Sequence, residues 1–251
     1  MTKIKNSAEI AQMQRAGEIL AIILHELRLA VRPGVTTYEL DALAFNLCKK
    51  HRVKPAFLGF NGYPASLCAS TNEVVVHGIP NKRKLADGDI LGLDMGVNHN
   101  GYYADSALTV PVGKIHKSAK ELIEITKKSL LLAIKTVKHG SRIGDIGAVV
   151  SQLAHEHGFG VIRELTGHGI GKKLQEDPSI PNYGTWGKGV LLEAGMTIAI
   201  EPMLTAGSPE IDLDRNDGWT IRTKDKSLAA HFEHTVLVTP SGCEILTKKP
   251  D

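Results

Sequence analysis

The stretch Ile90-Leu-Gly-Leu-Asp94-Met-Gly-Val-Asn-His-Asn100-Gly101-Tyr-Tyr-Ala-Asp105-Ser predicts a β-hairpin. Asn100-Gly101, between two apolar segments, is the strongest short-range signal for such a turn. Two registers fit. A loop centred on His99-Asn100 places Asp94 directly opposite Asp105, whereas a turn at Asn100-Gly101 places them diagonally, about 7–8 Å apart. Because side chains alternate along a strand, either register leaves both carboxylates on one face of the hairpin.

Two like charges on one face of an apolar hairpin repel each other unless a proton or a metal ion lies between them. The residues around this pair, such as Leu91, Leu93 and Leu108, make the surroundings poorly solvated. Alone, such a pair is more often two solvated aspartates on an open sheet face. Acidic residues and a histidine later in the chain favour the metal site.

The composition is that of an ordinary globular protein, with 42% hydrophobic and 23% charged residues among 251. The net charge of +3 is small and the basic residues are scattered, so no direct nucleic-acid site is expected. Cys48, Cys68 and Cys243 are widely spaced, which fits a reducing compartment. The longest apolar run, Ile19–Leu24, is too short for a membrane span and no signal peptide is recognisable. A cytoplasmic protein without a membrane segment is expected.

Four helices and several strands are predicted from capping signals and periodicity. Asn6-Ser-Ala-Glu9 and Thr36-x-x-Glu39 are capping boxes that begin the first two helices, and Pro33-Gly34 ends the first. Helical spacing returns over 118–138 and 144–157. Besides the hairpin, strands are predicted over 74–76, 159–165, 196–201, 229–239 and 242–246.

The order of the elements repeats. A long helix, Gly34, a short helix, a strand and His77-Gly-Ile in the first half match a long helix, Gly140, a short helix, a strand and His168-Gly-Ile in the second. The spacing between the matched points differs, so the likeness is architectural rather than a strict repeat. No linker separates the halves, so residues 1–251 are expected to form a single domain with its site between them.

Glu201 and Glu233 join the two aspartates and His168 as candidate metal ligands. Glu201 follows the apolar run Thr197–Ile200, although a lone glutamate of this kind is usually a solvated strand residue. Four carboxylates and one imidazole suit Mn²⁺, Fe²⁺ or Co²⁺ better than a thiolate-type zinc site. Two ions about 3.5–4 Å apart would balance this charge, acidify a bridging water and polarise a carbonyl group.

His77 and His168 each precede a glycine at a predicted strand end. Such a pair is often only a turn, but two at matching places in two halves favour a functional role. The glycine after each is expected to let the backbone approach a ligand closely.

Together these motifs resemble type I methionine aminopeptidase, a metallopeptidase family with the pita-bread fold, over essentially the whole chain. The matching motifs are Asn72-Glu-Val-Val-Val-His77-Gly-Ile-Pro80, Asp94 with Asp105 eleven residues on, Thr166-Gly-His168-Gly-Ile-Gly171, Ile200-Glu201-Pro-Met203 and Phe232-Glu233-His234-Thr. The resemblance implies an α+β fold. Its two pseudo-symmetric α/β halves share a curved, largely antiparallel sheet, which helices cover on one face.

The resemblance also implies the chemistry of the site. Two divalent ions, drawn from Co²⁺, Mn²⁺, Fe²⁺ and Zn²⁺, would be bound by Asp94, Asp105, His168, Glu201 and Glu233. Asp105 and Glu233 would bridge the ions, and the catalytic residues would be His77 and Glu201. His77 would contact the amine end or scissile amide of the substrate, and Glu201 would take a proton from the bridging water. The implied reaction removes the N-terminal methionine from nascent polypeptides, with the ribosome as a candidate docking partner and a monomer as the expected state.

One position departs from the family pattern. Gln175 stands where the motif usually has a second histidine, seven residues after His168, which in the family hydrogen-bonds the scissile amide. A glutamine donates a neutral hydrogen bond but cannot carry charge or pass on a proton. We expect a slower enzyme, or one in which another group has taken this role.

By resemblance, a pocket for the methionine side chain is lined by Phe60, Tyr63, Cys68 and Trp219, with Leu174 where an aromatic residue is common. An apolar, sulfur-containing lining suits a thioether. Residues of these types are also common in a core, and for Cys68 and Leu174 the core and pocket interpretations weigh equally.

Two other functions are compatible with the fold. A proline-specific aminopeptidase is the first, but such enzymes carry a large extra N-terminal domain, and here the catalytic fold is expected to begin within the first few residues. A non-catalytic peptide-binding or protein-binding relative is the second. Lost metal ligands would indicate it, and all five are present.

Overall fold

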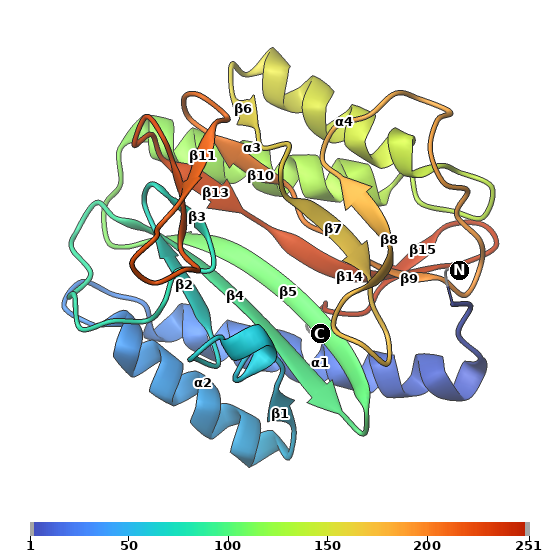
Figure 1. Ribbon diagram of the computed structural model, residues 1–251, viewed down its shortest axis with the longest axis horizontal. Helices are drawn as coiled ribbons and strands as arrows, with labels where there is room; N and C mark the ends of the chain where they lie inside the picture. The colour runs from blue at the N-terminus through green and yellow to red at the C-terminus, as the bar shows by residue number, and fades with distance from the viewer. Residues whose placement is uncertain (1–2, 249–251) are drawn as a thin grey trace.

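A nine-stranded sheet forms the centre of the computed structural model, which describes residues 3–248 (Figure 1). Its strand order is β1-β4-β5-β14-β9-β7-β8, with β2 also paired to β4 and β15 to β14, and all these pairs are antiparallel. The strands are β1 (Lys54–Pro55), β2 (Cys68–Thr71), β4 (Ile90–His99), β5 (Tyr102–Pro111), β7 (Thr166–Gly169), β8 (Glu176–Pro181), β9 (Thr197–Ile200), β14 (Glu233–Val238) and β15 (Cys243–Ile245).

Two small sheets flank the large one. The first pairs β10 (Met203–Thr205) with β13 (Ala229–His231) and β6 (Gly160–Val161). The second pairs β12 (Ile221–Thr223) with β11 (Ile211–Leu213) and β3 (Val74–Val76). A short 3₁₀ turn, Phe60–Gly62, precedes β2.

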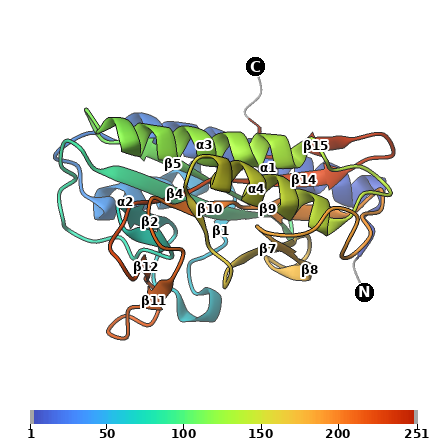
Figure 2. The same ribbon diagram turned by 90° about the horizontal axis from the view of Figure 1, so that it is seen from above.

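The helices cover one face of the large sheet, as Figure 2 shows. They are α1 (Ser7–Ala30), α2 (Thr37–His51), α3 (Lys117–Ile134) and α4 (Ile143–Glu156). Both predicted capping boxes are confirmed, with Asn6 capping α1 and Thr36 capping α2. Helix α1 packs on β4 and β5, whereas α3 and α4 pack against each other and against strands of the second half. No helix in the described range is long and apolar enough to cross a bilayer.

The β4–β5 hairpin has the second of the two predicted registers. Asn100 and Gly101 have φ values of 51° and 86°, as a type I′ turn requires, and His99 pairs with Tyr102. Asp105 therefore lies opposite Gly96 rather than Asp94. The directly facing register is wrong, and the two carboxylates are diagonal neighbours on one face.

Alternation along β4 explains why Asp94 faces away from the helices. Leu91, Leu93, Met95 and Val97 belong to the apolar core beneath α1 and α2. Because successive strand residues point to opposite faces, Asp94 lies on the helix-free face. A second core, under α3 and α4, supports the second half and includes Leu122, Ile146, Ile198 and Val236. Both cores thus lie on the helix side, which leaves the opposite face for the site.

The structure corrects two predicted strands. Only Gly160–Val161 of the stretch 159–165 is a strand, and His168 lies within β7 rather than after a strand. The stretch 229–239 is interrupted at Phe232, because β13 pairs with β10 while β14 joins β5 and β9 in the large sheet. Strand β8 was not predicted, since prolines at 178 and 181 argue against a strand.

Candidate metal centre

A cavity of about 240 Å³ lies on the helix-free face and draws its walls from both halves of the chain. The residues lining it are Phe57, Phe60, Asn61, Tyr63, Cys68, His77, Asp94, Asp105, His168, Leu174, Gln175, Glu201, Trp219 and Glu233. Every residue that the sequence analysis assigned to the site is among them. Phe57 and Asn61 were not predicted. The structure therefore brings the set together, while the metal-binding and substrate-binding roles remain predictions.

Asp94 and Asp105 are both buried, at 8% and 5% exposure. Reciprocal hydrogen bonds hold the backbone of Asp105, whose N–H donates to Thr235 Oγ1 (3.0 Å) while the Thr235 hydroxyl donates to Asp105 O (2.8 Å). Burial, and then the charge of Asp105, raises the pKa of Asp94 well above its usual value. Burial raises the pKa of Asp105 to about 7. Without a cation, both carboxyls therefore keep their protons to higher pH than an exposed aspartate does.

Glu233 and Glu201 come from neighbouring strands of the large sheet. Glu233 opens β14 opposite Ala107 of β5, and Glu201 directly follows β9. The pKa values of both glutamates are raised well above the usual value, first by burial and then by the charge of Asp105. Four carboxyl groups thus share one poorly solvated space.

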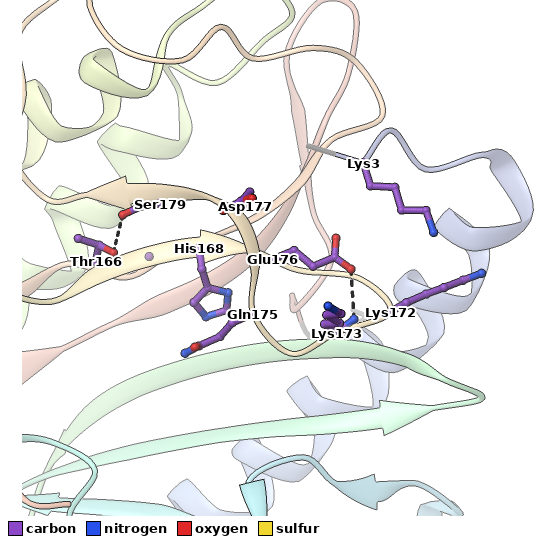
Figure 3. Close-up of a pocket in the computed structure, with 10 residues that line it drawn as sticks. Lys3, Thr166, His168, Lys172, Lys173, Gln175, Glu176, Asp177 and Ser179 are labelled. Atoms are coloured by element: carbon purple, nitrogen blue, oxygen red, sulfur yellow. Dashed lines mark hydrogen bonds between the residues drawn. The ribbon is translucent and has the colours of Figure 1, made fainter. Parts of the chain in front are cut away.

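His168 presents one ring nitrogen to this carboxyl cluster. Its Nδ1 lies 2.9 Å from Gly169 O, and because a carbonyl oxygen can only accept, Nδ1 carries the proton. Nε2, 3.6 Å from Glu201 Oε1, is therefore left with a free lone pair. Burial lowers the pKa of His168, which favours the neutral, ligating form. Figure 3 shows the ring extending from β7 toward the hairpin, beside Gln175.

The donor set fits a divalent cation. One ligand atom each from Asp105, His168 and Glu233 lies within 4.8 Å of the others. Three buried oxygens, Asp94 Oδ1, Asp105 Oδ1 and Glu233 Oε1, have no hydrogen-bond partner among residues 3–248. Buried carboxylate oxygens without partners are strongly unfavourable unless a proton or a cation is present. Oxygen ligands with one imidazole are those of a hard or borderline ion.

His231 is a buried imidazole that the sequence analysis did not assign to the site. Its Nε2 lies 3.7 Å from Glu201 Oε2 and has no hydrogen-bond partner in the described part of the chain. Burial, and secondarily the charge of His77, lowers the pKa of His231 to about 3, so the ring is neutral. Glu201 is therefore flanked by His168 at one oxygen and His231 at the other. His231 lies two positions before Glu233, and residues with this spacing point to the same face of a strand. This spacing is the sequence signal that places His231 near the site.

His77 follows β3 in a left-handed conformation, with φ of 57°. Its ring makes an edge contact with Trp219, with centroids 6.2 Å apart, and burial lowers the pKa of His77. That Gly78 and Gly169 let a ligand approach stays a prediction, and the structure gives each glycine another role. A Cβ at Gly78 would collide with the Ala69 carbonyl, and one at Gly169 with the Asp177 carbonyl, so both glycines allow neighbouring backbone to approach.

The predicted side-chain pocket is one wall of the same cavity. Tyr63 and Trp219 meet edge to face at 5.1 Å, and the Tyr63 hydroxyl donates to Gly78 O at 3.0 Å. Cys68 pairs with Asp94 across β2 and β4, and burial raises the pKa of its thiol well above the usual value. Cys68 and Leu174 belong to a buried apolar cluster and also line the cavity, and their role in a substrate pocket stays a prediction.

A larger cavity of about 640 Å³ adjoins the first and shares His168 and Gln175 with it (Figure 3). Polar residues line it, among them Lys3, Thr166, Lys172, Lys173, Glu176, Asp177 and Ser179. Gln175 therefore stands at the boundary between the carboxyl-lined cavity and this more open polar one.

The family model "Metallopeptidase family M24" matches residues 11–240 of this chain. Methionine aminopeptidase of Clostridium acetobutylicum is 46% identical to it, over 98% of this chain and 99% of that protein. Methionine aminopeptidase 1 of Bacillus subtilis is 44% identical, over 97% and 98%.

Solved structures agree with these relatives. Methionine aminopeptidase of Thermotoga maritima has a TM-score of 0.97 at 46% identity, covering 99% of this chain and 100% of that chain. A prolidase from Pyrococcus furiosus has a TM-score of 0.79 at 23% identity, and the match covers 99% of this chain but 66% of that one. The second likeness extends to the fold alone.

Proposed function

This chain belongs to metallopeptidase family M24, and from that membership and the geometry of its cavity we propose that it hydrolytically removes the N-terminal methionine from polypeptides. The predicted pita-bread fold and the resemblance to type I methionine aminopeptidase are confirmed. One observation supports the proposal: the five side chains proposed as metal ligands, from distant parts of the chain, line one cavity together with His77. A single domain over residues 1–251, a monomeric state and docking at the ribosome stay predictions.

As a metallopeptidase the chain uses a divalent metal. We propose two ions, which would be held by Asp94, Asp105, His168, Glu201 and Glu233. Co²⁺, Mn²⁺, Fe²⁺ and Zn²⁺ are the candidates, because each accepts carboxylate and imidazole ligands. When bound, such ions acidify a water molecule and polarise the scissile carbonyl.

Glu201 is proposed as the proton acceptor. Its carboxylate lines the cavity among the proposed ligands, within reach of a metal-bound water, and in the metal-free protein burial and the nearby aspartate charges raise its pKa. The carboxylate lies between two imidazoles, with His168 Nε2 at 3.6 Å and His231 Nε2 at 3.7 Å. His77, neutral because burial lowers its pKa, is proposed to contact the substrate's amine end or scissile amide.

The methionine side chain is proposed to occupy the wall formed by Phe60, Tyr63, Cys68 and Trp219. A thioether makes favourable contacts with aromatic rings, and a neutral thiol adds a soft apolar surface. The main chain beyond the first residue would then pass Gln175 into the polar cavity of Figure 3.

Purified protein is expected to bind close to two Mn²⁺ or Co²⁺ ions per chain and to release free methionine from Met-Ala-type peptides. Metal content by elemental analysis and methionine release by chromatography test this directly. Cleavage confined to bonds before proline would support a proline-specific aminopeptidase instead. Tight metal binding without release from any N-terminus would support a non-catalytic binding protein.

The variant Gln175→His is expected to raise kcat for methionine release, by up to about 10²–10³, because it restores a donor that can carry charge and pass on a proton. Steady-state kinetics at saturating metal measure the change. Lys173→His, on the same loop but lining only the outer cavity, is the matched control and should leave kcat unchanged. An unchanged or lower kcat for Gln175→His would contradict this account of the position.

A further inference from the structure

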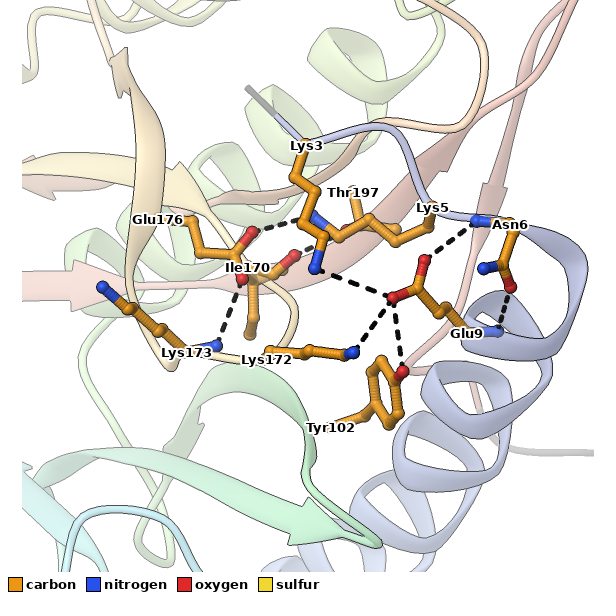
Figure 4. A network of polar contacts seen from close by, with 10 residues as sticks. All are labelled: Lys3, Lys5, Asn6, Glu9, Tyr102, Ile170, Lys172, Lys173, Glu176 and Thr197. Carbon is orange, nitrogen blue, oxygen red and sulfur yellow. Dashed lines mark hydrogen bonds and ion pairs between the residues drawn. The ribbon is translucent and has the colours of Figure 1, made fainter. Parts of the chain in front are cut away.

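The loop over 170–175, between β7 and β8, carries Leu174 and Gln175 to the cavity. Its neighbours include the N-terminal segment of the chain, which lies far away in sequence (Figure 4). Lys5 of that segment reaches the loop, and its partner Glu176 directly follows Gln175.

Glu176 closes the loop with its two carboxylate oxygens. Oε1 accepts the backbone N–H of Lys173 at 3.1 Å, and Oε2 accepts the ammonium of Lys5 at 2.8 Å. Burial acts to raise the pKa of Glu176, but the bonds from Lys5 and Lys173 outweigh it and lower the pKa below its usual value. The carboxylate is therefore charged, and it connects the loop to Lys5.

Lys5 is an anchored and almost fully buried partner. Its side chain is 3% exposed, against 14% for that of Glu176, and its backbone N–H donates to Gly195 O at 2.9 Å. The aliphatic part of the Lys5 side chain packs against Gly171. A Cβ atom added at Gly171 would lie only 2.6 Å from Lys5 Cε. A buried ammonium without a partner is strongly unfavourable, so Lys5 and Glu176 fix each other's position.

The other ion pair between this loop and the N-terminal region is weaker. Lys172 Nζ lies 3.4 Å from Glu9 Oε1, and the Lys172 side chain is 54% exposed. Solvent screens such pairs, and they contribute little to structure. Figure 4 shows Glu9 surrounded by Lys3, Lys172 and the Tyr102 hydroxyl, apart from the Lys5–Glu176 pair. The buried pair is therefore the contact that sets the loop.

We propose that Lys5 and Glu176 are a positioning pair for the reaction, which holds the loop so that Leu174 and Gln175 face the cavity. Both residues act through the loop, because neither of them lines the carboxyl-lined cavity. This inference rests on the proposed function for its kinetic consequence. The order imposed on the loop can be measured independently of activity.

The test uses Lys5→Met, which keeps the length of the side chain and removes its charge. A displaced substrate contact lowers the rate by up to about a hundredfold, so kcat/KM for methionine release should fall about tenfold to a hundredfold. Arg15→Met is the matched control, because it also replaces a basic residue of an ion pair by methionine. Arg15 pairs with Glu18 on the exposed surface of α1, so kcat/KM should stay unchanged. Glu176→Gln keeps an oxygen for the Lys173 amide and tests the same pair if Lys5→Met does not fold.

Hydrogen exchange and a second background separate positioning from general destabilisation. Backbone amides of 171–176 should exchange faster in Lys5→Met, while those of α3 exchange as in the wild type. In a Gln175→Ala background, Lys5→Met should lower kcat/KM far less than in the wild type, because its effect passes through the loop residue already removed.

Unchanged hydrogen exchange at 171–176 in Lys5→Met would overturn the proposal. So would a double variant in which the losses of kcat/KM from Lys5→Met and Gln175→Ala simply multiply. A Gln175→Ala variant with full activity beside an impaired Lys5→Met variant would overturn it too. If the wild type itself released no methionine, the proposed function would fail, and the exchange measurement would still decide whether the pair orders the loop.

Discussion

Glu201→Gln is expected to lower kcat for methionine release by about 10²–10⁴, the usual contribution of a positioned acid or base. The amide has nearly the shape of the carboxyl group but cannot accept a proton in the way a carboxylate does. Glu201 is buried between His168 Nε2 and His231 Nε2, at 3.6 and 3.7 Å, so no solvent molecule easily takes its place. Steady-state kinetics on a Met-Ala-type peptide, with metal content measured on the same sample, give the result.

The control is Glu210→Gln, the same change at a carboxylate that is 67% exposed and paired with Lys224 on the surface. It should leave both kcat and metal content unchanged. A Glu201→Gln protein with full metal content and wild-type kcat would remove Glu201 from the mechanism. Loss of metal together with activity would instead assign Glu201 mainly a ligand role.

Stabilisation by added metal is expected to grow as pH rises toward about 7. In the metal-free folded protein burial raises the pKa of Asp105 from 3.8 to about 7, whereas in the unfolded chain the carboxyl ionises at its ordinary value. Between these two values the folded state binds more protons than the unfolded state, so the stability of the metal-free protein falls as pH rises through this window. In the metal-bound protein a cation takes the place of the protons on the buried carboxyl groups, so the folded state no longer depends on keeping them protonated.

Thermal unfolding with saturating Mn²⁺ or with a chelator measures this effect. At a metal concentration about 1,000 times Kd, one site adds about 4 kcal/mol, or about 8–16 °C in Tm for a chain of this size. The difference should be largest above about pH 7 and much smaller near pH 5, where protons compete with the metal. Asp105→Asn should reduce both the difference and its pH dependence. A metal-induced shift that is the same at all these pH values would contradict the proton–metal exchange.

Features with a local physical cause were predictable from the sequence. The capping boxes at Asn6 and Thr36 involve residues three positions apart, and the Asn100-Gly101 turn involves adjacent ones. Side-chain alternation placed Asp94 and Asp105 on one face in either register. Residue chemistry also singled out the five candidate ligands, because carboxylates in apolar strands are difficult to explain without a cation.

Short, polar or proline-containing strands were not predictable in the same way. Strand β8 carries two prolines, and the stretch 229–239 changes partners at Phe232 without a local signal. Such strands are stabilised by neighbours from elsewhere in the chain, so their own composition does not identify them.

By itself, the sequence determined the secondary-structure signals, the shared face of the two aspartates and the types of side chain available for a metal site. Only the tertiary structure decided the hairpin register, the position of His231 beside Glu201 and the pairing of Lys5 with Glu176. The reason is physical. Local geometry acts over a few residues, whereas burial and charge pairing depend on which distant segments the fold brings together.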